Sequence, residues 1–308
     1  HIKKKLNEKR FFYLKKKIKL EEYEKLRLLG EKSIISEEKL SRIYPQENLF
    51  SHIIGQIDDD NNGISGIEKF YDYELKSRKE PLTLTVDTDV QFLIREELLK
   101  FQEIFKSVGS AAILMDVNNG NIISMVSLPD YNLNKREEIK DIKFINRASK
   151  GVYELGSVFK TFTLAAGINE KEIESNTLFE NLPKNITCAG RPIREYDNEI
   201  PSDLTAEEIL IRSGNIGSVR IAQKIGIEKF KSFLEKIGVL NKIEFDIEEV
   251  GQPLPFRWGK CKLATSSFGH GITTTPLQLA KGYAIISNGG YDIKPTLIKK
   301  NDSQKIIK

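Results

Sequence analysis

A serine and a lysine three residues apart form the pair with the clearest chemical potential in this chain of 308 residues. Ser157 and Lys160 lie at the predicted start of a helix, where side chains at this spacing are neighbours. A serine hydroxyl is a weak nucleophile at neutral pH, and a lysine can activate it only if its surroundings hold the amine neutral. The spacing therefore predicts Ser157 as a nucleophile and Lys160 as its base.

The same pattern also occurs at Ser36 and Lys39, but within a charged stretch. At the first position, Gly156 permits a close backbone approach, and a mainly apolar run follows that predicts a buried helix. This run contains Val158, Phe159, Phe162, Leu164, Ala165 and Ala166. The alternative interpretation is a serine that caps a helix and a lysine that extends along it to solvent.

A second element can supply the rest of a site. Ser213-Gly-Asn215 is the only Ser-x-Asn sequence in the chain, and it lies between two predicted helices, residues 206–212 and 216–224. Alone, it reads as a polar turn between helices. Together with Ser157 and Lys160, it offers a second hydroxyl and an amide.

With these motifs the sequence resembles the transpeptidase domain of a class B penicillin-binding protein, of the division-specific type found in Gram-negative bacteria. The resemblance extends over nearly the whole chain, and several further segments occur in the family's order. These are Arg42-Ile-Tyr-Pro45, His52-Ile-Ile-Gly55, Asn62-Gly-Ile-Ser-Gly66-Ile-Glu68, Met115-Asp-Val-Asn-Asn-Gly120, Ser124-Met-Val-Ser-Leu-Pro129, Phe268-Gly-His-Gly271 and Thr275-Pro-Leu-Gln-Leu279.

The family's third motif, Lys-Thr-Gly or Lys-Ser-Gly, does not occur in this sequence. Relatives carry it on a strand that follows the segment similar to residues 275–291. The chain also opens on His1, and Leu155 stands where many relatives have proline. We expect a fragment of a longer protein, without its membrane anchor and third motif, that folds poorly and is not acylated when expressed alone.

The resemblance implies an α+β fold of the penicillin-binding and serine β-lactamase type, an antiparallel sheet flanked by helices whose C-terminal strands are missing here. Residues 1–78 resemble the end of the family's N-terminal non-catalytic pedestal domain, and residues 79–308 its transpeptidase domain. A two-stranded hairpin is marginal by itself, so we expect the remaining strands to come from elsewhere in the protein.

Local patterns predict the main elements of this fold. Turn residues predict a turn over residues 58–63, alternation predicts a strand over Leu82–Asp87, and helical spacing of apolar residues predicts a helix over residues 91–105. Asn118-Asn-Gly120 predicts a hairpin between residues 110–117 and 122–127. Amphipathic spacing predicts a helix over Ile227–Ile237, and Thr275 with Pro276 starts a last helix that ends at Gly289-Gly290.

The resemblance also implies a reaction. Ser157 attacks the penultimate carbonyl of a peptidoglycan stem peptide ending in D-Ala-D-Ala, and an amine of a neighbouring stem then takes the acyl group. Lys160 accepts the proton of Ser157, Ser213 relays it to the leaving nitrogen, and Asn215 holds the substrate amide. The Ser157 N–H supplies one oxyanion donor, and the absent strand would supply the second. β-Lactams acylate Ser157 and then stall.

Location and partners follow from the resemblance alone. It implies septal cell-wall synthesis, with a glycan polymerase and division proteins as partners, an anchor in the inner membrane, and the catalytic domain in the periplasm. Two other classes stay open: a D,D-carboxypeptidase or β-lactamase-like hydrolase, and a non-catalytic division scaffold. A hydrolase needs a positioned water, and no glutamate in the sequence convincingly supplies it.

Composition excludes several other classes. A net charge of +4 from 48 basic and 44 acidic residues gives no general attraction to nucleic acid. The basic runs Lys3–Lys5 and Lys15–Lys17 could suit a membrane surface, but glutamates follow at once, which favours a solvated helix face. No apolar run is long enough to span a membrane.

Metals and cofactors are not indicated either. Cys188 and Cys261 lie far apart, show no metal-ligand spacing, and neither require nor exclude an oxidising compartment. His52 and His270 are read as structural, since neither lies in a hydrolase motif.

Overall fold

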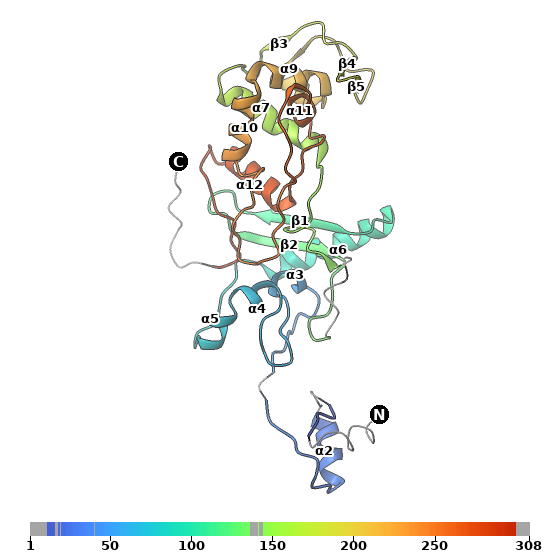
Figure 1. Cartoon of the computed structure of the whole chain (residues 1–308), viewed down its shortest axis with the longest axis vertical. Helices are drawn as coiled ribbons and strands as arrows, with labels where there is room; N and C mark the ends of the chain where they lie inside the picture. The colour runs from blue at the N-terminus through green and yellow to red at the C-terminus, as the bar shows by residue number, and fades with distance from the viewer. Residues whose placement is uncertain are drawn as a thin grey trace.

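The computed structural model describes residues 11–15, 18, 20–39, 41–135, 141 and 144–299. The basic residues Lys3–Lys5, Lys16 and Lys17 lie outside the described residues. Helix α2 (Leu20–Leu28) lies at one extreme of the molecule, apart from the remaining elements (Figure 1), and buries no side chain. Lys15 pairs with Glu22 at 2.6 Å, in agreement with a solvated charged helix face.

The next segment folds against the body of the molecule. It forms α3 (Ser51–Ile54), α4 (Gly66–Phe70) and α5 (Asp72–Ser77). The predicted turn at residues 58–63 is confirmed, because Asp58 accepts hydrogen bonds from the backbone N–H of Asp60 and Asn62. Two of the resemblance segments meet here, since Arg42 pairs with the buried Glu68 at 2.8 Å.

The predicted hairpin is confirmed as strands β1 (Ser110–Met115) and β2 (Ile122–Leu128), which pair antiparallel with Ile113 opposite Met125. Gly120 closes its turn with φ +76°, a conformation that glycine adopts without steric cost. The predicted helix is α6 (Thr88–Phe105), which lies along β2. Its buried Gln91 donates to the carbonyls of Leu49 and Met125, so the helix is tied to the core that the sheet and the α3 segment share.

The strand predicted over Leu82–Asp87 is wrong. Its alternating apolar side chains do pack against the sheet core, but its backbone forms a single bridge, between Leu84 and Ile298, and one hydrogen bond from the Asp87 N–H to Ile123, not a ladder. Asp87 then caps α6 by accepting from the N–H groups of Asp89 and Val90. The segment therefore turns into a helix before a ladder can extend.

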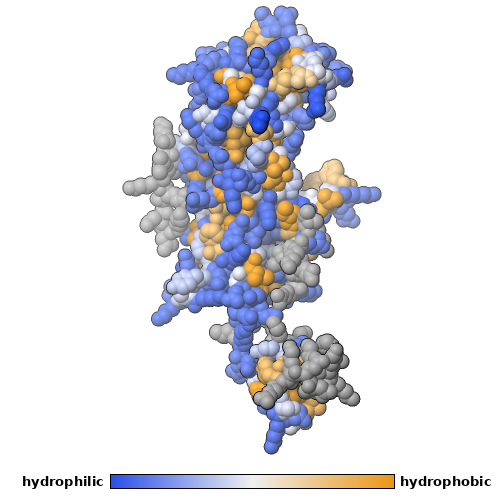
Figure 2. Space-filling model, viewed as in Figure 1, coloured by the Kyte–Doolittle hydropathy of each residue, from blue (hydrophilic) through white to orange (hydrophobic). Residues whose placement is uncertain are grey.

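Apolar side chains gather on the outer side of α6 (Figure 2), and the residues concerned are Phe92, Leu93, Phe101, Ile104 and Phe105, each at least half exposed. Within the described residues the hairpin has no third strand, although Ile122 donates its N–H to Thr296 at 2.9 Å. The sheet layer is thus narrow, and one of its covering helices keeps an apolar face in solvent.

The rest of the chain is mainly helical, as the sequence predicts. The 3₁₀ turn η2 (Gly156–Phe159) leads into α7 (Lys160–Asn169), which packs against α9 (Asn215–Ile225). Around this pair lie α8 (Ala206–Ile211), α10 (Ile227–Lys236), α11 (Lys260–Ser266) and α12 (Pro276–Ser287). The predicted cap of the last helix is present, since Thr275 accepts from the Gln278 N–H.

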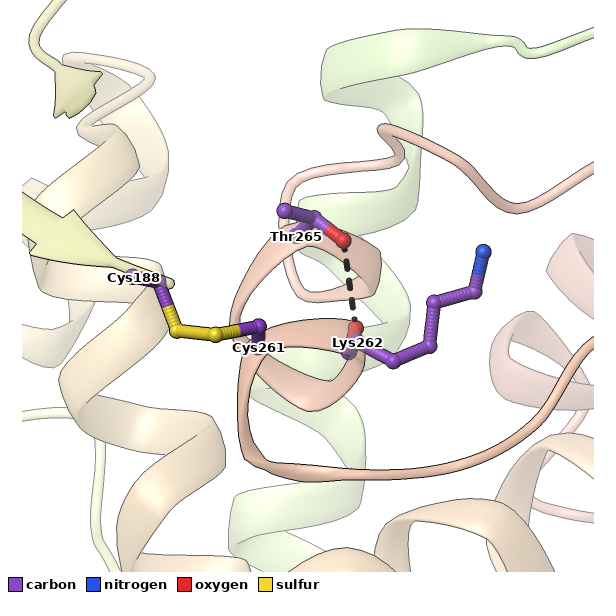
Figure 3. The surroundings of a disulfide bond; sticks show 4 residues. All are labelled: Cys188, Cys261, Lys262 and Thr265. Carbon is purple, nitrogen blue, oxygen red and sulfur yellow. Dashed lines mark hydrogen bonds between the residues drawn. A yellow bond between two sulfur atoms is a disulfide. The ribbon is translucent and has the colours of Figure 1, made fainter. Parts of the chain in front are cut away.

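Two short ladders are absent from the sequence predictions: β3 (Leu178–Phe179) with β6 (Leu204–Thr205), and the hairpin of β4 (Asn185–Cys188) and β5 (Arg191–Arg194). A disulfide joins Cys188, at the tip of that hairpin, to Cys261 in α11, with 5.5 Å between their Cα atoms (Figure 3). The two cysteines that seemed uninformative in sequence thus tie a hairpin to the helical core.

Candidate active site

Ser157 lies in η2, and its side chain is exposed to solvent. Gly156 precedes it with φ +62°, which turns the chain sharply into the helix. Lys160 is the first residue of α7 and is almost completely buried. The local fold therefore presents the hydroxyl outward and keeps the amine inside.

The buried amine of Lys160 contacts both serine motifs. Its Nζ lies 3.1 Å from Ser157 Oγ, 2.9 Å from Ser213 Oγ and 2.5 Å from the Ser213 carbonyl oxygen. Burial lowers the pKa of Lys160 from 10.5 to about 8, and the negative charge of Glu195 limits this decrease. A useful fraction of the amine is thus neutral near physiological pH, as a base requires.

Ser213 occupies an unusual backbone position. It follows the end of α8 with φ +54°, in the left-handed region that glycine usually takes after a helix. The Ser213 N–H donates to Leu210 at 3.0 Å, and the Gly214 N–H donates to Ile209 at 2.8 Å, the pattern of a Schellman helix end. A serine that accepts this steric cost, on the order of 1 kcal/mol, indicates a functional constraint.

Asn215 begins α9 directly after this turn. Its side-chain Nδ2 donates to the Arg194 carbonyl at 2.9 Å, and its backbone N–H donates to Glu195 at 2.6 Å. The Ile216 N–H donates to the other oxygen of Glu195 at 2.9 Å. The end of β5 therefore sets the start of the helix that carries the second motif.

The turn Phe268–Gly271 lies against the backbone of Gly156, the residue before Ser157. A Cβ on Gly269 would stand 1.9 Å from the Gly156 carbonyl oxygen, so no side chain fits there. The Gly271 N–H donates to Glu154 at 2.9 Å. His270 is exposed beside Glu154, at 3.4 Å, rather than within a core.

The second Ser-x-x-Lys sequence forms no such pair. Lys39 contacts the Asp59 carbonyl at 2.9 Å and Asp60 at 3.4 Å, and no contact joins it to Ser36. His52 is buried, with its ring nitrogen 3.0 Å from the Pro129 carbonyl, as expected of a structural residue. In the sequence, Ser157–Lys160 is separated from Ser36–Lys39 because an apolar run surrounds the first pair and charged residues surround the second. The structure agrees, since only the first pair is in contact in the described residues.

Sequence reasoning missed Glu195 and the disulfide. The stretch 191–195 carries no motif of its own, and a spacing of 73 residues between cysteines says nothing about proximity. In the described part of the chain no group of three metal-ligating side chains comes together. Nor is any described helix long and apolar enough to cross a membrane.

Residues 110–307 match the family described as the penicillin-binding protein transpeptidase domain. This match covers most of the chain and includes both serine motifs. The chain belongs to the penicillin-binding protein transpeptidase family. Its relatives and structural neighbours align it with the class B, FtsI-like members.

Two curated relatives illustrate the similarity. The chain is 31% identical to the probable peptidoglycan D,D-transpeptidase FtsI of Caulobacter vibrioides, over 88% of this chain and 46% of the relative. It is 28% identical to the peptidoglycan D,D-transpeptidase FtsI of Escherichia coli, over 95% of this chain and 54% of the relative. The chain thus spans about half the length of the curated relatives it matches.

Solved structures show the same penicillin-binding fold. Penicillin-binding protein 3 of Mycobacterium tuberculosis has a TM-score of 0.75 at 22% identity, over 84% of this chain and 61% of that one. The transpeptidase domain of penicillin-binding protein 3 from Burkholderia pseudomallei has a TM-score of 0.64 at 25% identity, over 75% of this chain and 65% of that one. The expected α+β transpeptidase fold is confirmed.

Proposed function

We propose that the full-length protein containing this chain is a serine D,D-transpeptidase that cross-links peptidoglycan stem peptides. The observation that carries this proposal is the position of the buried Lys160 amine, 3.1 Å from the exposed Ser157 hydroxyl and 2.9 Å from the Ser213 hydroxyl. The family and the curated relatives, which are named peptidoglycan D,D-transpeptidases, support the same reaction.

The acylation step follows from these contacts. Ser157 Oγ forms an ester bond with the penultimate carbonyl of a D-Ala-D-Ala stem, while its proton moves to the neutral Lys160 Nζ. Ser213, which also contacts Nζ, passes its proton to the departing D-alanine nitrogen as the peptide bond breaks and takes a proton from Lys160 in its place, so that the amine is neutral again. The Ser157 N–H stabilises the oxyanion, and Asn215 orients the substrate amide.

The second half-reaction restores the enzyme. The amine of a neighbouring stem attacks the Ser157 ester and gives up a proton through Ser213 and Lys160, and the Ser157 oxygen regains a proton. A β-lactam forms the same ester by opening its ring, and the penicillin-binding protein 3 structure that contains aztreonam shows that such a neighbour binds this drug class. We propose β-lactams as covalent inhibitors of this protein.

The site offers little support for a hydrolase. Glu195 acts on Lys160 through its charge, but both of its oxygens already accept backbone N–H groups of α9. A carboxylate engaged in this way is poorly placed to activate water. Acyl transfer to an amine is therefore the favoured reaction.

A labelling experiment tests the reaction. Fluorescent penicillin should mark the full-length protein covalently, and a proteolytic peptide containing Ser157 should carry the adduct. Ser157→Ala should abolish the label, whereas Ser36→Ala should keep it. Rapid spontaneous release of the label would point to a hydrolase, and no label on the wild-type protein would point to a scaffold.

We further propose a septal role, with a glycan polymerase and division proteins as partners and the catalytic domain in the periplasm behind an inner-membrane anchor. The FtsI names of the relatives support the septal role, and the disulfide suits an oxidising compartment. Depleted cells should form filaments without septa, and uniformly rounded cells would contradict this.

The division into two domains is likewise a proposal, with residues 1–78 as the end of a pedestal and residues 79–308 as the transpeptidase domain. It is supported by the break between α5, which ends at Ser77, and α6, which begins at Thr88. In this proposal the pedestal end packs directly on the transpeptidase domain, since Phe50, Ile53 and Ile67 share a core with Ile122 and Met125 of β2.

A further inference from the structure

Helix α9 lacks a capping side chain of its own. Its N-cap residue is Gly214, which offers no side-chain acceptor. The first N–H groups of a helix have no partner within it, and a nearby Ser, Thr, Asp or Asn usually supplies one. The helix that carries the second serine motif must therefore take its cap from elsewhere in the chain.

Glu195 supplies that cap from 20 residues away in sequence. Its two carboxylate oxygens accept the N–H groups of Asn215 at 2.6 Å and Ile216 at 2.9 Å. The preceding residue, Arg194, accepts the Asn215 side-chain amide at 2.9 Å. A carboxylate at this end of a helix also interacts favourably with the helix dipole.

The turn between α8 and α9 is consequently fixed from both sides. The Schellman bonds of Ser213 and Gly214 attach it to α8, and Glu195 attaches its other end to β5. Ser213 lies between these attachments and makes two contacts with Lys160. A shift of the α9 start would therefore move the Ser213 hydroxyl relative to the amine.

The disulfide supports the segment that carries Glu195. Cys188 and Arg191 pair at the tip of the β4–β5 hairpin, and the Cys188–Cys261 bond holds this tip to α11. Glu195 leaves the other end of the hairpin, where its N–H donates to the Lys184 carbonyl at 3.2 Å. Because α11 itself packs on α9, the hairpin is braced against the helix that it caps.

We propose that Glu195 is a positioning residue of the transpeptidase site, which holds the α8–α9 turn so that Ser213 and Asn215 face Lys160 and the substrate. This role rests on the function proposed above. The carboxylate also acts on Lys160 electrostatically, since its charge favours the protonated amine. Within the described chain, the Lys160 amine is hydrogen-bonded to Ser157 on η2 and to Ser213. The charge that acts on its pKa is that of Glu195.

The test compares Glu195→Gln, Glu195→Asp and the control Glu199→Gln, an exposed acid on the same loop. The glutamine keeps the shape but removes the charge and one of the two acceptors. In the full-length protein we expect it to shift the pH profile of penicillin acylation to lower pH and to lower its plateau rate about tenfold or more. Glu195→Asp should restore the wild-type midpoint, and Glu199→Gln should match the wild type throughout.

A second readout separates this proposal from the proposed function. The ¹³C NMR signal of the Lys160 side chain can be titrated whether or not the protein is acylated. A lower Lys160 midpoint in Glu195→Gln, with unchanged Glu199→Gln, supports the role of Glu195 even if penicillin labelling fails. An unchanged midpoint together with an unchanged plateau rate in Glu195→Gln would overturn it.

Discussion

The pKa of Lys160 should set the pH dependence of acylation. Burial lowers this pKa from 10.5 to about 8, so the folded protein binds the lysine proton more weakly than an exposed lysine does. Only the neutral amine can accept the Ser157 proton across the 3.1 Å contact. The acylation rate should therefore rise with pH up to the pKa and level off above it.

The size of the effect follows from the neutral fraction. With a pKa of about 8, about 1% of the amine is neutral at pH 6, about 9% at pH 7 and about 90% at pH 9. The rate should thus increase about tenfold from pH 6 to 7, about tenfold again from pH 7 to 9, and level off above about pH 9. An ordinary lysine would have only about 0.03% neutral amine at pH 7 and would show no plateau below pH 10.

The assay is the second-order rate of fluorescent penicillin labelling of the full-length protein between pH 6 and 9. Lys160→Arg is the control, because a guanidinium stays protonated over this range, and its residual rate should lack the rise. A wild-type profile that is flat over this interval, or that climbs tenfold per unit to its upper end, would refute a lysine base with a midpoint near 8.

Three further outcomes are expected. Ser213→Gly and Ser213→Ala should slow acylation equally. The glycine variant should have a free energy of unfolding about 1 kcal/mol higher than the alanine variant in denaturant, since only glycine accepts φ +54° freely. Equal free energies of unfolding for the two variants would contradict the backbone argument. Gly269→Ala should lower the unfolding free energy by about 2 kcal/mol or more and impair labelling, because its Cβ would meet the Gly156 carbonyl; wild-type behaviour would show that the two turns can separate. Replacing both Cys188 and Cys261 by serine should cost about 4 kcal/mol of stability for a loop of 73 residues, measured by unfolding without reductant; a loss below about 1 kcal/mol would mean that the unfolded chain is not constrained by the bond.

The elements with strong local signals could be predicted from the sequence. Asn118 to Gly120 predicts the hairpin because few residues accept positive φ, and Thr275 with Pro276 predicts the start of α12 because both suit a helix N-terminus. The apolar residues after Ser157 separated it from Ser36. In each of these cases the local preference of the residues matches the structure that the chain adopts there.

The parts that depend on distant contacts could not be predicted. The alternation of Leu82–Asp87 reports which side chains are buried, but a strand also needs a continuous partner, and this segment has one bridge to Ile298 and one backbone hydrogen bond to Ile123. Glu195 caps a helix that begins 20 residues later, and Cys188 bonds to Cys261 across a sequence separation of 73 residues. No local pattern encodes such encounters, so these residues become visible only in three dimensions.

The attachment of the Gly269 turn to Gly156 has a consequence for how substitutions act on the candidate site. Tyr153 and Thr274 exchange two backbone hydrogen bonds, Glu154 accepts the Gly271 N–H, and Gly269 touches Gly156. Residues 153–156 and residues 269–274 must therefore move together. Substitutions within residues 269–274 are thus expected to change the position of Ser157 through this shared backbone, and with it the penicillin reactivity proposed above.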